Sequence, residues 1–492
     1  MSLIVGVSRC GCQLCMAYAM SHPLASIHCT DAAGLELVWR AGDTYETRLG
    51  GYFIKSQIQN YKSEIANHLF TGKFSTDVLW NLGSLALLGA SGVLINTIIA
   101  HYQSPTSLGV FNQAFAFYIV LSQLAVGGMQ FSIVKYLSHT DDRHLMAIII
   151  SSALVAITVT AGLVAVVAFL FAHSIGVLFK SEDVGLGIQF ICPALLLFSV
   201  NKGFMMVLNG TRRMRAFAIF QGLRYLLIIV GIIGLILAGF AGPYLAWCFL
   251  VSEFFLAIGL IGFVHKSIVG FRLRAVARSW IFRHLSFGMR GFFGGMLSDL
   301  NTRVDIILLG YFLDDASVGI YSFAAVFAEG FGQISYVVKQ NLDPIIGRFT
   351  AAGSIDQLRS LMRKVVLVFV PSMLALSIVS VLLFPVMVRF FTDDRFLESW
   401  PIFAILLAGV AINAGFRPFQ GIFLLTGQPG LHSLFFLTVV LSNAILNVLF
   451  IQRMGTMGAA VATSLAYAIE SLLIFYGIRK ILVVKEVSAC AR

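Results

Sequence analysis

Several basic side chains stand inside runs of apolar residues, where a charge is costly unless it faces a cavity or a partner. Arg forks and Lys ammonium groups are the side chains that hold phosphate oxygens in proteins. These cations therefore predict a site for a pyrophosphate group, although each would equally neutralise an acid or extend to the membrane surface. They are Lys202, Arg224, Arg417 and, nearer the end of its run, Arg290.

Acidic residues form a second set of candidates. Asp299 and Glu329 are expected at a similar depth, and Arg303 follows Asp299 by one helical turn. An i,i+4 ion pair between Asp299 and Arg303 is the simplest explanation of that pair. Asn301 and Asp305 are expected on nearly the opposite face of the same helix, so we expect only one of the two faces to line a cavity.

Glu253 and Glu470 occupy matching places in the two halves of the chain. A buried carboxylate can titrate near neutral pH and bind a proton or Na⁺ during transport. Hydrogen bonds to neighbours within each half are an equally good explanation. These two residues, with Asp299 and Arg303, are therefore candidates for ion coupling or for cavity charge.

Two apolar segments carry polar residues at helical spacing. One stripe of polar residues lies in an otherwise apolar segment of the second half of the chain. The other lies in the segment of the first half that matches it in the repeat. We expect both stripes to line one central cavity, with hydrogen bonding between packed helices as the alternative. The stripe residues are Glu329, Gln333, Tyr336 and Gln340 in the second half and Asn112, Gln123 and Gln130 in the first.

Catalytic motifs do not occur in the sequence. It has no G-x-x-x-x-G-K-[ST], H-E-x-x-H or G-x-S-x-G segment, and these spacings serve nucleotide, zinc and acyl-transfer chemistry. A glycan polymerase would need a large outer loop with catalytic residues, and the outer segments are short. We therefore expect no enzyme activity, no cofactor and no metal.

The composition is that of a membrane protein. Of 492 residues, 58% are hydrophobic and 12% are charged, and the mean hydropathy is +0.89. Soluble proteins have about 25% charged residues, and apolar runs this long span a bilayer as helices rather than as barrel strands. The net charge of +11 fits basic cytoplasmic loops better than nucleic-acid binding. We predict an all-α polytopic membrane protein with no nucleic-acid partner.

The chain reads as a duplicated unit. Residues 98–139 and 306–344 match at an offset of 210, which pairs Gly109 with Gly319 and Gln123 with Gln333. Two parallel repeats with a site between them are therefore expected. The predicted spans are 78–100, 107–134, 145–173, 184–208, 215–239, 243–264, 286–311, 316–343, 365–390, 399–425, 431–451 and 456–478.

Charge in the connecting segments predicts the orientation. With the N-terminus inside, eighteen Lys and Arg residues fall on the inner side, against Lys180, Arg395 and Arg453 on the outer side. Such a bias places both termini in the cytoplasm. We expect a disordered cytoplasmic extension at 1–73, six-helix bundles at 74–264 and 286–480, a basic amphipathic linker at 265–285 and a cytoplasmic tail at 481–492.

The extension holds four of the seven cysteines. Cys10, Cys12, Cys15 and Cys29 do not match a standard zinc-site spacing. We assign no function to this cysteine group.

Three segments carry a resemblance to a known family: WNLGSLALLGASGVLIN, SLGVFNQAFAFYIVLSQLAVGGMQFSIVKYLS and DIILLGYFLDDASVGIYSFAAVFAEGFGQ. They resemble the Wzx-type polysaccharide flippases of the multidrug/oligosaccharidyl-lipid/polysaccharide exporter (MOP) superfamily, over about residues 74–480. The resemblance implies a central cavity that opens alternately to the two sides of a bacterial inner membrane. It also implies a substrate made of an oligosaccharide on a polyprenyl pyrophosphate carrier, used for O-antigen, capsule or exopolysaccharide.

Membrane lipids and a polysaccharide polymerase or chain-length machinery are the partners that such a flippase implies. The first span has no Arg, whereas the lipid II flippase branch carries one there, so that branch fits less well. The alternative function on the same fold is a cation-coupled multidrug exporter of the MATE type, which would have an acidic cavity.

Overall fold

The computed structural model describes residues 27–30, 36–39, 73–269, 273–351 and 354–490, in two compact units that divide between Ser75 and Thr76. In the first unit, the structure describes the first residues of the helix that begins at Lys73 and an antiparallel pair of strands, β1 (Ile27–Thr30) and β2 (Glu36–Trp39), with Cys29 opposite Leu37. This pair lies in the segment for which we expected no structure. The other three N-terminal cysteines lie outside the described residues.

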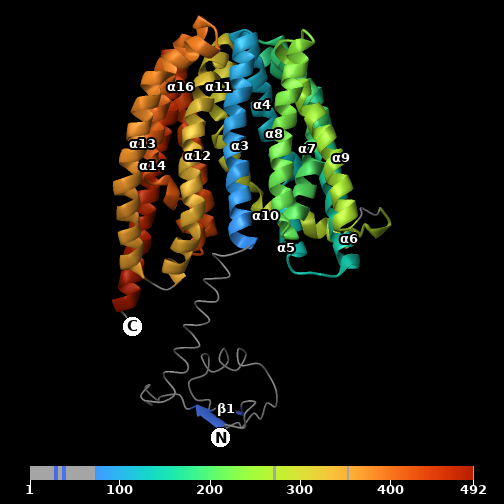
Figure 1. Ribbon diagram of the computed structural model, residues 1–492, viewed down its shortest axis with the longest axis vertical. Coiled ribbons are helices and arrows are strands. Elements are labelled where there is room, and N and C mark those ends of the chain that lie inside the picture. Colours follow the sequence, from blue (N-terminus) through green and yellow to red (C-terminus); the bar gives the residue numbers. More distant parts are fainter. Residues whose placement is uncertain (1–26, 31–35, 40–72, 270–272, 352–353, 491–492) are drawn as a thin grey trace. The chain divides into compact units, whose positions relative to one another are not determined.

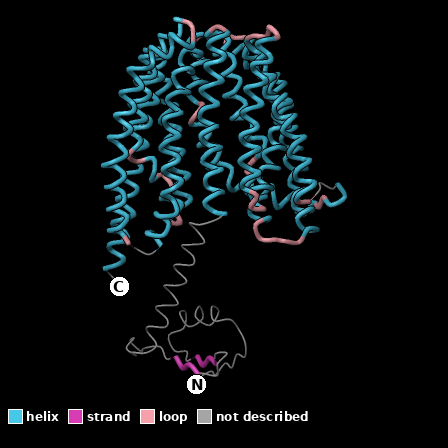
Figure 2. The backbone as a smooth tube through the Cα atoms, viewed as in Figure 1, coloured by secondary structure: helices cyan, strands magenta, loops and turns pink. Residues whose placement is uncertain are grey.

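The second unit is helical, with most of its loops short and gathered at two ends (Figure 2). Gly455 interrupts α16 with non-helical angles (φ 59°, ψ −135°), so α16 is two helices joined by a kink. The helices are α3 (Lys73–Tyr102), α4 (Pro105–Val126), α5 (Met129–Leu137), α6 (Arg143–Leu178), α7 (Glu182–Gly210), α8 (Met214–Leu237), α9 (Trp247–Ser267), α10 (Arg278–Asn301), α11 (Val304–Phe312), α12 (Asp315–Ala351), α13 (Ile355–Phe391), α14 (Ser399–Ala414), α15 (Ile422–Leu425) and α16 (Pro429–Cys490), with 3₁₀ turns η1 (Gly242–Ala246), η2 (Leu273–Ala275), η3 (Asp394–Glu398) and η4 (Arg417–Phe419).

Each predicted span falls on one of these helices or on a pair separated by a break. Within the described residues, eight helical segments are long and apolar enough to cross a bilayer. The predicted all-α fold class is confirmed, and the count of twelve crossings stays a prediction.

The segment that we predicted as a linker, 265–285, is partly helical. Helix α9 continues to Ser267 and α10 already begins at Arg278. His284, which we expected in the linker, is fully buried, and its Nδ1 lies 2.5 Å from the Ser132 hydroxyl of α5. Apolar residues such as Trp280 and Ile281 pack on the core formed by α5, α6 and α7, so this stretch folds against the first bundle.

Two groups of helices make up the second unit (Figure 1). Helices α4 to α9 pack on one another, and α12 to α16 form the other group. Helix α10 contacts α4, α5 and α6 of the first group and α16 of the second. Helix α10 therefore contacts both groups.

The direct contact between the groups is the crossing of α4 and α12, close to where both helices begin. At this point a Cβ on Gly109 would overlap the carbonyl oxygen of Asp315, and a Cβ on Gly319 would overlap that of Pro105. The two glycines that the repeat pairs thus meet in space. Their missing side chains let the two backbones touch.

Asp315 adds a polar connection across the same contact. Its carboxylate accepts hydrogen bonds from Gln113 Nε2 of α4 and from the Ser181 hydroxyl before α7, both 2.6 Å long. We call this end of the molecule, where α4 and α12 start, the closed end; it is the upper end in Figure 1.

We predict that Gly109→Val or Gly319→Val forces the closed end apart, because the new side chain overlaps backbone atoms that cannot move away. Overpacking of this kind costs about 1–3 kcal/mol or more. The reactivity of a cysteine introduced at Ser322, a residue buried between the groups, towards a water-soluble maleimide should rise. The control is Gly234→Val on α8, where a Cβ meets no atom within 4 Å. Unchanged labelling in both glycine variants would contradict the prediction.

Candidate functional site

A cavity of about 320 Å³ lies between the two groups of helices. Helices α3, α4, α8 and α9 line one side of it, and α10, α11, α12, α14, η4 and α16 line the other. Aromatic and aliphatic side chains form much of the wall. The side chains with charged or hydrogen-bonding groups are Asn96, Asn112, Tyr225, Asn301, Thr302, Arg303, Asp305, Tyr321, Ser322, Glu329, Gln333, Arg417, Asn443, Thr463 and Tyr467.

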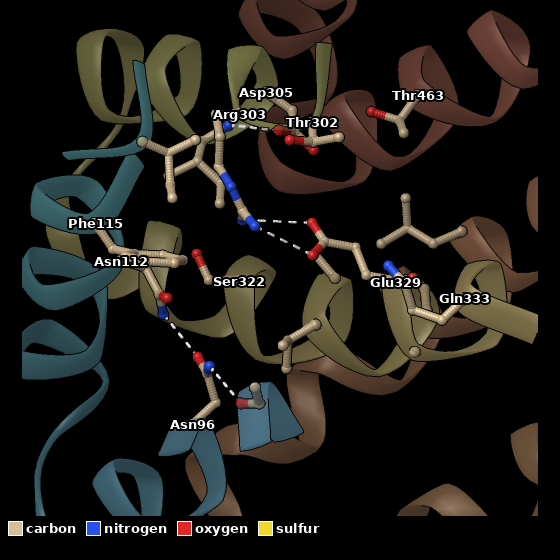
Figure 3. A pocket seen from close by; sticks show the side chains of 18 of the residues that line it. Asn96, Asn112, Phe115, Thr302, Arg303, Asp305, Ser322, Glu329, Gln333 and Thr463 are labelled. Carbon is tan, nitrogen blue, oxygen red and sulfur yellow. Dashed lines mark hydrogen bonds and ion pairs between the residues drawn. The ribbon is translucent and has the colours of Figure 1, made fainter. Parts of the chain in front are cut away.

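Arg303 stands at a break in the helical segment that we predicted as one span. Helix α10 ends at Asn301 and α11 starts at Val304, so Thr302 and Arg303 lie outside both helices. The Arg303 guanidinium reaches both carboxylate oxygens of Glu329 on α12, each at 3.4 Å (Figure 3). It also lies 5.2 Å above the ring of Phe115 on α4. Arg303 therefore contacts both groups of helices inside the cavity.

This break overturns two expectations. The i,i+4 pair between Asp299 and Arg303 does not form, because the helix ends between them and Arg303 pairs with Glu329 instead. Asn301 and Asp305 do not lie on an excluded face, since both line the cavity together with Arg303. Asp299 is outside the cavity lining; it interacts electrostatically with Lys202 and Arg303 and by a hydrogen bond with Gln123, but forms no ion-pair contact with Arg303.

Asp305 is buried, and each of its carboxylate oxygens accepts a hydrogen bond. It accepts a 2.6 Å bond from the Tyr321 hydroxyl of α12 and a 2.9 Å bond from the Ile306 backbone N–H. Thr463 of α16 lies 3.4 Å from the same Tyr321 oxygen. This chain joins α11, α12 and α16 along one wall of the cavity.

The predicted polar stripes enter the cavity only in part. Asn112, Glu329 and Gln333 line it. The Asn112 amide donates a 2.8 Å bond to Asn96 of α3, which in turn donates to the Gly92 carbonyl (Figure 3).

The remaining stripe residues lie elsewhere. Gln123 accepts a bond from Lys202 at 3.2 Å, within the first group of helices. Gln130 is buried beyond the break at Gly127 and Gly128. Tyr336 and Gln340 are exposed on the part of α12 that runs away from the cavity.

The four predicted phosphate-binding cations do not form one cluster. The Arg224 Nε atom pairs with Glu253 at 2.8 Å, and its guanidinium stacks on the Phe198 ring at 4.7 Å. Lys202 lies over the same ring at 5.7 Å. Arg290 is exposed on α10 and bonds to the Ser286 hydroxyl.

Arg417 is the predicted cation that lines the cavity. It stands in η4, a turn between α14 and α15, and its Nη1 lies 3.2 Å from the place that a Cβ on Gly332 of α12 would take. Among the residues that the structure describes, none forms a hydrogen bond or ion pair with this guanidinium. Arg417 is thus a cavity cation without a bound counter-charge.

Glu253 and Glu470 are both held inside their own groups. Besides Arg224, Glu253 accepts a 2.8 Å bond from Asn201. Glu470 accepts bonds from Asn413 at 2.6 Å and from Gln420 at 2.7 Å. Neither carboxylate lines the cavity.

Several cavity residues were not predicted. Asn96 and Asn443 are single polar residues in apolar runs, a signal that could have been used. Ser322, Thr463 and Tyr467 gave no signal, because small or aromatic residues of this kind are common in packed membrane helices. Within the described chain, no three His, Cys, Asp or Glu side chains are grouped as metal ligands would be.

Solved structures with this arrangement define the class of protein. An inward-facing MATE family multidrug transporter of the MOP superfamily superposes with a TM-score of 0.67 at 14% identity, over 82% of this chain and 95% of that one. The lipid II flippase MurJ, in an inward closed conformation, gives 0.66 at 18% identity, over 85% and 91%. The outward-facing form of a MATE transporter gives 0.56. The chain is a multi-pass membrane protein with the fold of the MOP superfamily transporters.

Sequence comparison narrows the class to a family. Residues 77–346, more than half of the chain, match the polysaccharide biosynthesis protein family, and the chain belongs to it. The probable low-salt glycan biosynthesis flippase Agl15 of Haloferax volcanii is 29% identical over 175 residues. That alignment spans 35% of this chain and 36% of the relative, about a third of its length. The predicted resemblance is confirmed at the level of the family and the fold.

We predict that the Arg224–Glu253 ion pair stabilises the first group of helices rather than binding substrate. Arg224→Ala leaves a buried, unpaired carboxylate, which should cost about 3–5 kcal/mol and lower both the melting temperature and the amount of protein in the membrane. The double variant Arg224→Met with Glu253→Leu removes both charges and should recover most of the loss, since Asn201 keeps its bond to the Glu253 backbone carbonyl.

Thermal unfolding of the purified protein measures this effect, with Arg290→Ala as the control for the loss of one exposed cation. A double variant as unstable as Arg224→Ala would show that the pair is not the cause. A stable double variant that has lost transport would instead indicate that Arg224 binds substrate.

Proposed function

We propose that the protein is a flippase that moves polyprenyl-pyrophosphate-linked oligosaccharide units across a bacterial inner membrane, for the synthesis of O-antigen, capsule or exopolysaccharide. The family and the name of the archaeal relative support glycan biosynthesis. The observation that carries the proposal is the unpaired Arg417 guanidinium in a cavity between two groups of helices.

The cavity chemistry suits the polar part of such a substrate. Phosphate oxygens in a site of low dielectric need Arg or Lys partners, and Arg offers a planar fork of donors. Asn96, Asn112, Gln333 and Asn443 present amide groups that can bind sugar hydroxyls. The volume of about 320 Å³ is at the lower end of the range for ligand pockets. It is enough for a pyrophosphate with part of a sugar, while the lipid tail stays in the bilayer.

Arg303 is a second cation for the same group. Its two bonds to Glu329 are 3.4 Å long, whereas strong pairs of this type are about 2.7–2.9 Å long. Replacing the Glu329 carboxylate by a phosphate oxygen as the partner of Arg303 therefore loses little interaction energy. Such an exchange would release Glu329 and loosen the connection between α11 and α12.

The placement of the contacts supports transport by alternating access. With both termini in the cytoplasm, as the charge bias predicts, the closed end faces outward and the cavity loads from the inner side. Separation of α4 from α12 at Gly109 and Gly319 would then open the outer side. Ion coupling is part of the proposal, with Glu329 and Asp305 as the carboxylates that line the cavity. A polysaccharide polymerase or chain-length machinery is the partner expected next to the exit.

We predict that Arg417→Ala reduces export of the polysaccharide at least tenfold, and that Arg417→Glu abolishes it. The reason is that a charge-assisted bond to phosphate is worth about 1.5–3 kcal/mol, or roughly tenfold to a hundredfold. The measurement is complementation of a flippase-deficient strain, normalised to the amount of protein in the membrane. Arg453→Ala, which removes an exposed cation from α16, is the control. Full export by Arg417→Glu at a normal protein level would sink the proposed role.

The MATE-type drug exporter predicts a different outcome. An acidic cavity would suit cationic drugs, but this cavity holds two carboxylates, Asp305 and Glu329, and two arginines, Arg303 and Arg417. Resistance to cationic dyes on expression, lost in Glu329→Gln and kept in Arg417→Ala, would favour the exporter.

A further inference from the structure

The Arg303 guanidinium stands between an aromatic ring and a carboxylate (Figure 3). It lies 5.2 Å from the centre of the Phe115 ring on α4. Its two terminal nitrogens lie 3.4 Å from the two carboxylate oxygens of Glu329 on α12. Phe115 and Glu329 both line the cavity, and both are partly exposed. We call the place that the guanidinium takes between them the Phe115–Glu329 site.

Arg303 is held in this site by weak contacts. Its bonds to Glu329 are longer than the roughly 2.7–2.9 Å of strong charge-assisted bonds. Its Nε atom is buried, and within the described part of the chain this atom has no hydrogen-bond partner. The residue itself lies in the break between α10 and α11, outside both helices. An anion bound in the cavity can therefore draw this side chain out of the site with little loss of interaction energy.

A hydroxyl group without a partner lines the same cavity. Ser322 is 2% exposed, and no described residue forms a hydrogen bond with its Oγ atom. It comes two turns before Glu329 on α12, so both side chains lie on one face of that helix. A buried hydroxyl without a partner is unfavourable, and a polar ligand in the cavity would supply the missing bond.

These groups suit a sugar ring. A pyranose has an apolar face of C–H groups and an edge of hydroxyl groups. The apolar face packs on an aromatic ring, and the hydroxyl groups need hydrogen-bond acceptors and donors. Phe115, with Tyr225 of α8 on the same side of the cavity, offers aromatic surface. Glu329 and Ser322 offer the hydrogen-bonding groups on the other side.

The charges of the cavity determine which kind of sugar fits. Arg303 and Arg417 balance Asp305 and Glu329. A pyrophosphate group that binds both arginines leaves Glu329 without its cation. An ionised carboxylate only accepts hydrogen bonds, so the freed Glu329 favours a sugar with hydroxyl or amide N–H groups. It repels a sugar that carries a carboxylate of its own.

We propose that the Phe115–Glu329 site is a sugar subsite that Arg303 covers, and that it selects a neutral sugar over a uronic acid next to the pyrophosphate. The pyrophosphate draws Arg303 aside, and the first sugar then takes the place of the guanidinium. The order of events rests on the proposed function, because it needs a pyrophosphate group in the cavity. The subsite itself does not, since it is built from the contacts of Phe115, Glu329 and Arg303.

Selectivity for a neutral sugar is tested by comparing two probes that differ in charge at one carbon. They are glucosyl and glucuronosyl farnesyl pyrophosphate, with binding measured on the full chain in nanodiscs. The wild type should bind the glucosyl probe at least about tenfold more tightly, since an unpaired buried charge or acceptor is that costly. Equal affinities, or tighter binding of the glucuronosyl probe, overturn the selectivity.

The role of Glu329 is tested by the ratio of these two affinities. In Glu329→Gln the ratio should fall towards one, because the amide keeps hydrogen bonds but has no charge. The ratio is used because loss of Glu329 also frees Arg303 and raises the affinity for every anionic probe. The matched control is Asp343→Asn, which removes a partly buried carboxylate of the same helix that pairs with Lys339. An unchanged ratio in Glu329→Gln overturns the assignment.

Stacking on Phe115 is tested with a methyl-capped farnesyl pyrophosphate, which has the charge of the glucosyl probe but no sugar. Phe115→Leu should weaken binding of the glucosyl probe by about twofold to tenfold and leave the methyl-capped probe unchanged. The control is Phe131→Leu on α5, which alters an exposed aromatic residue outside the cavity lining. Equal losses for both probes, or no loss for either, overturn the stacking.

The covering role of Arg303 is tested without pyrophosphate. Methyl glucoside should give no saturation-transfer NMR signal with the wild type. It should give one with Arg303→Ala and lose it again in the double variant Arg303→Ala with Phe115→Leu. No signal with Arg303→Ala, or an equal signal with the wild type, overturns the covered subsite. Wild-type affinity of Arg417→Ala for the methyl-capped probe overturns the pyrophosphate site instead, while the glucoside result still decides the subsite.

Discussion

The backbone contact between α4 and α12 at Gly109 and Gly319 determines where everything else can lie. It is the point at which the two groups of helices touch without side chains between them, and small residues are what allow such close approach in membranes. The cavity residues follow this contact along both helices. Asn112 and Phe115 come one to two turns after Gly109, and Ser322 comes one turn after Gly319, so the contact sets how far apart the cavity walls stand.

Breaks in the helices then supply the chemistry. A continuous helix satisfies its own backbone and points each side chain in a fixed direction, so it cannot turn residues from two faces into one space. The break at Thr302 and Arg303 changes the direction of the chain, and as a result Asn301, Arg303 and Asp305 all line one cavity. The turn at η4 has the same effect for Arg417. Non-helical backbone within a membrane is tolerated where it lines a cavity or is buried in protein, which is where both breaks lie.

The sequence predicted the fold class, the duplication and a polar cavity with a cation, because these depend on long apolar runs and on residues repeated at a constant offset. It failed at Arg303, whose partner depends on a break that no Pro or Gly announces in Leu300 to Arg303. It also failed to place Gln123. A stripe of polar residues at helical spacing shows that they share one face of a helix, but it does not show which other helix that face contacts. In the sequence, Arg224 and Glu253 are two isolated charges in apolar runs. Only the packing of the helices shows that they form an ion pair with each other rather than a binding site.

The duplication also explains why the two halves need not act alike. Identical halves would place the same groups on both walls of the cavity, whereas its two arginines, Arg303 and Arg417, both come from the second half. In the first half, Arg224 is neutralised inside its bundle by Glu253 at 2.8 Å. In the second half, the amide groups of Asn413 and Gln420 donate to Glu470, and Arg417 lines the cavity. One carboxylate with a cation as its partner and one with amide partners make the two halves of a duplicated scaffold different, and the cavity that they enclose is asymmetric.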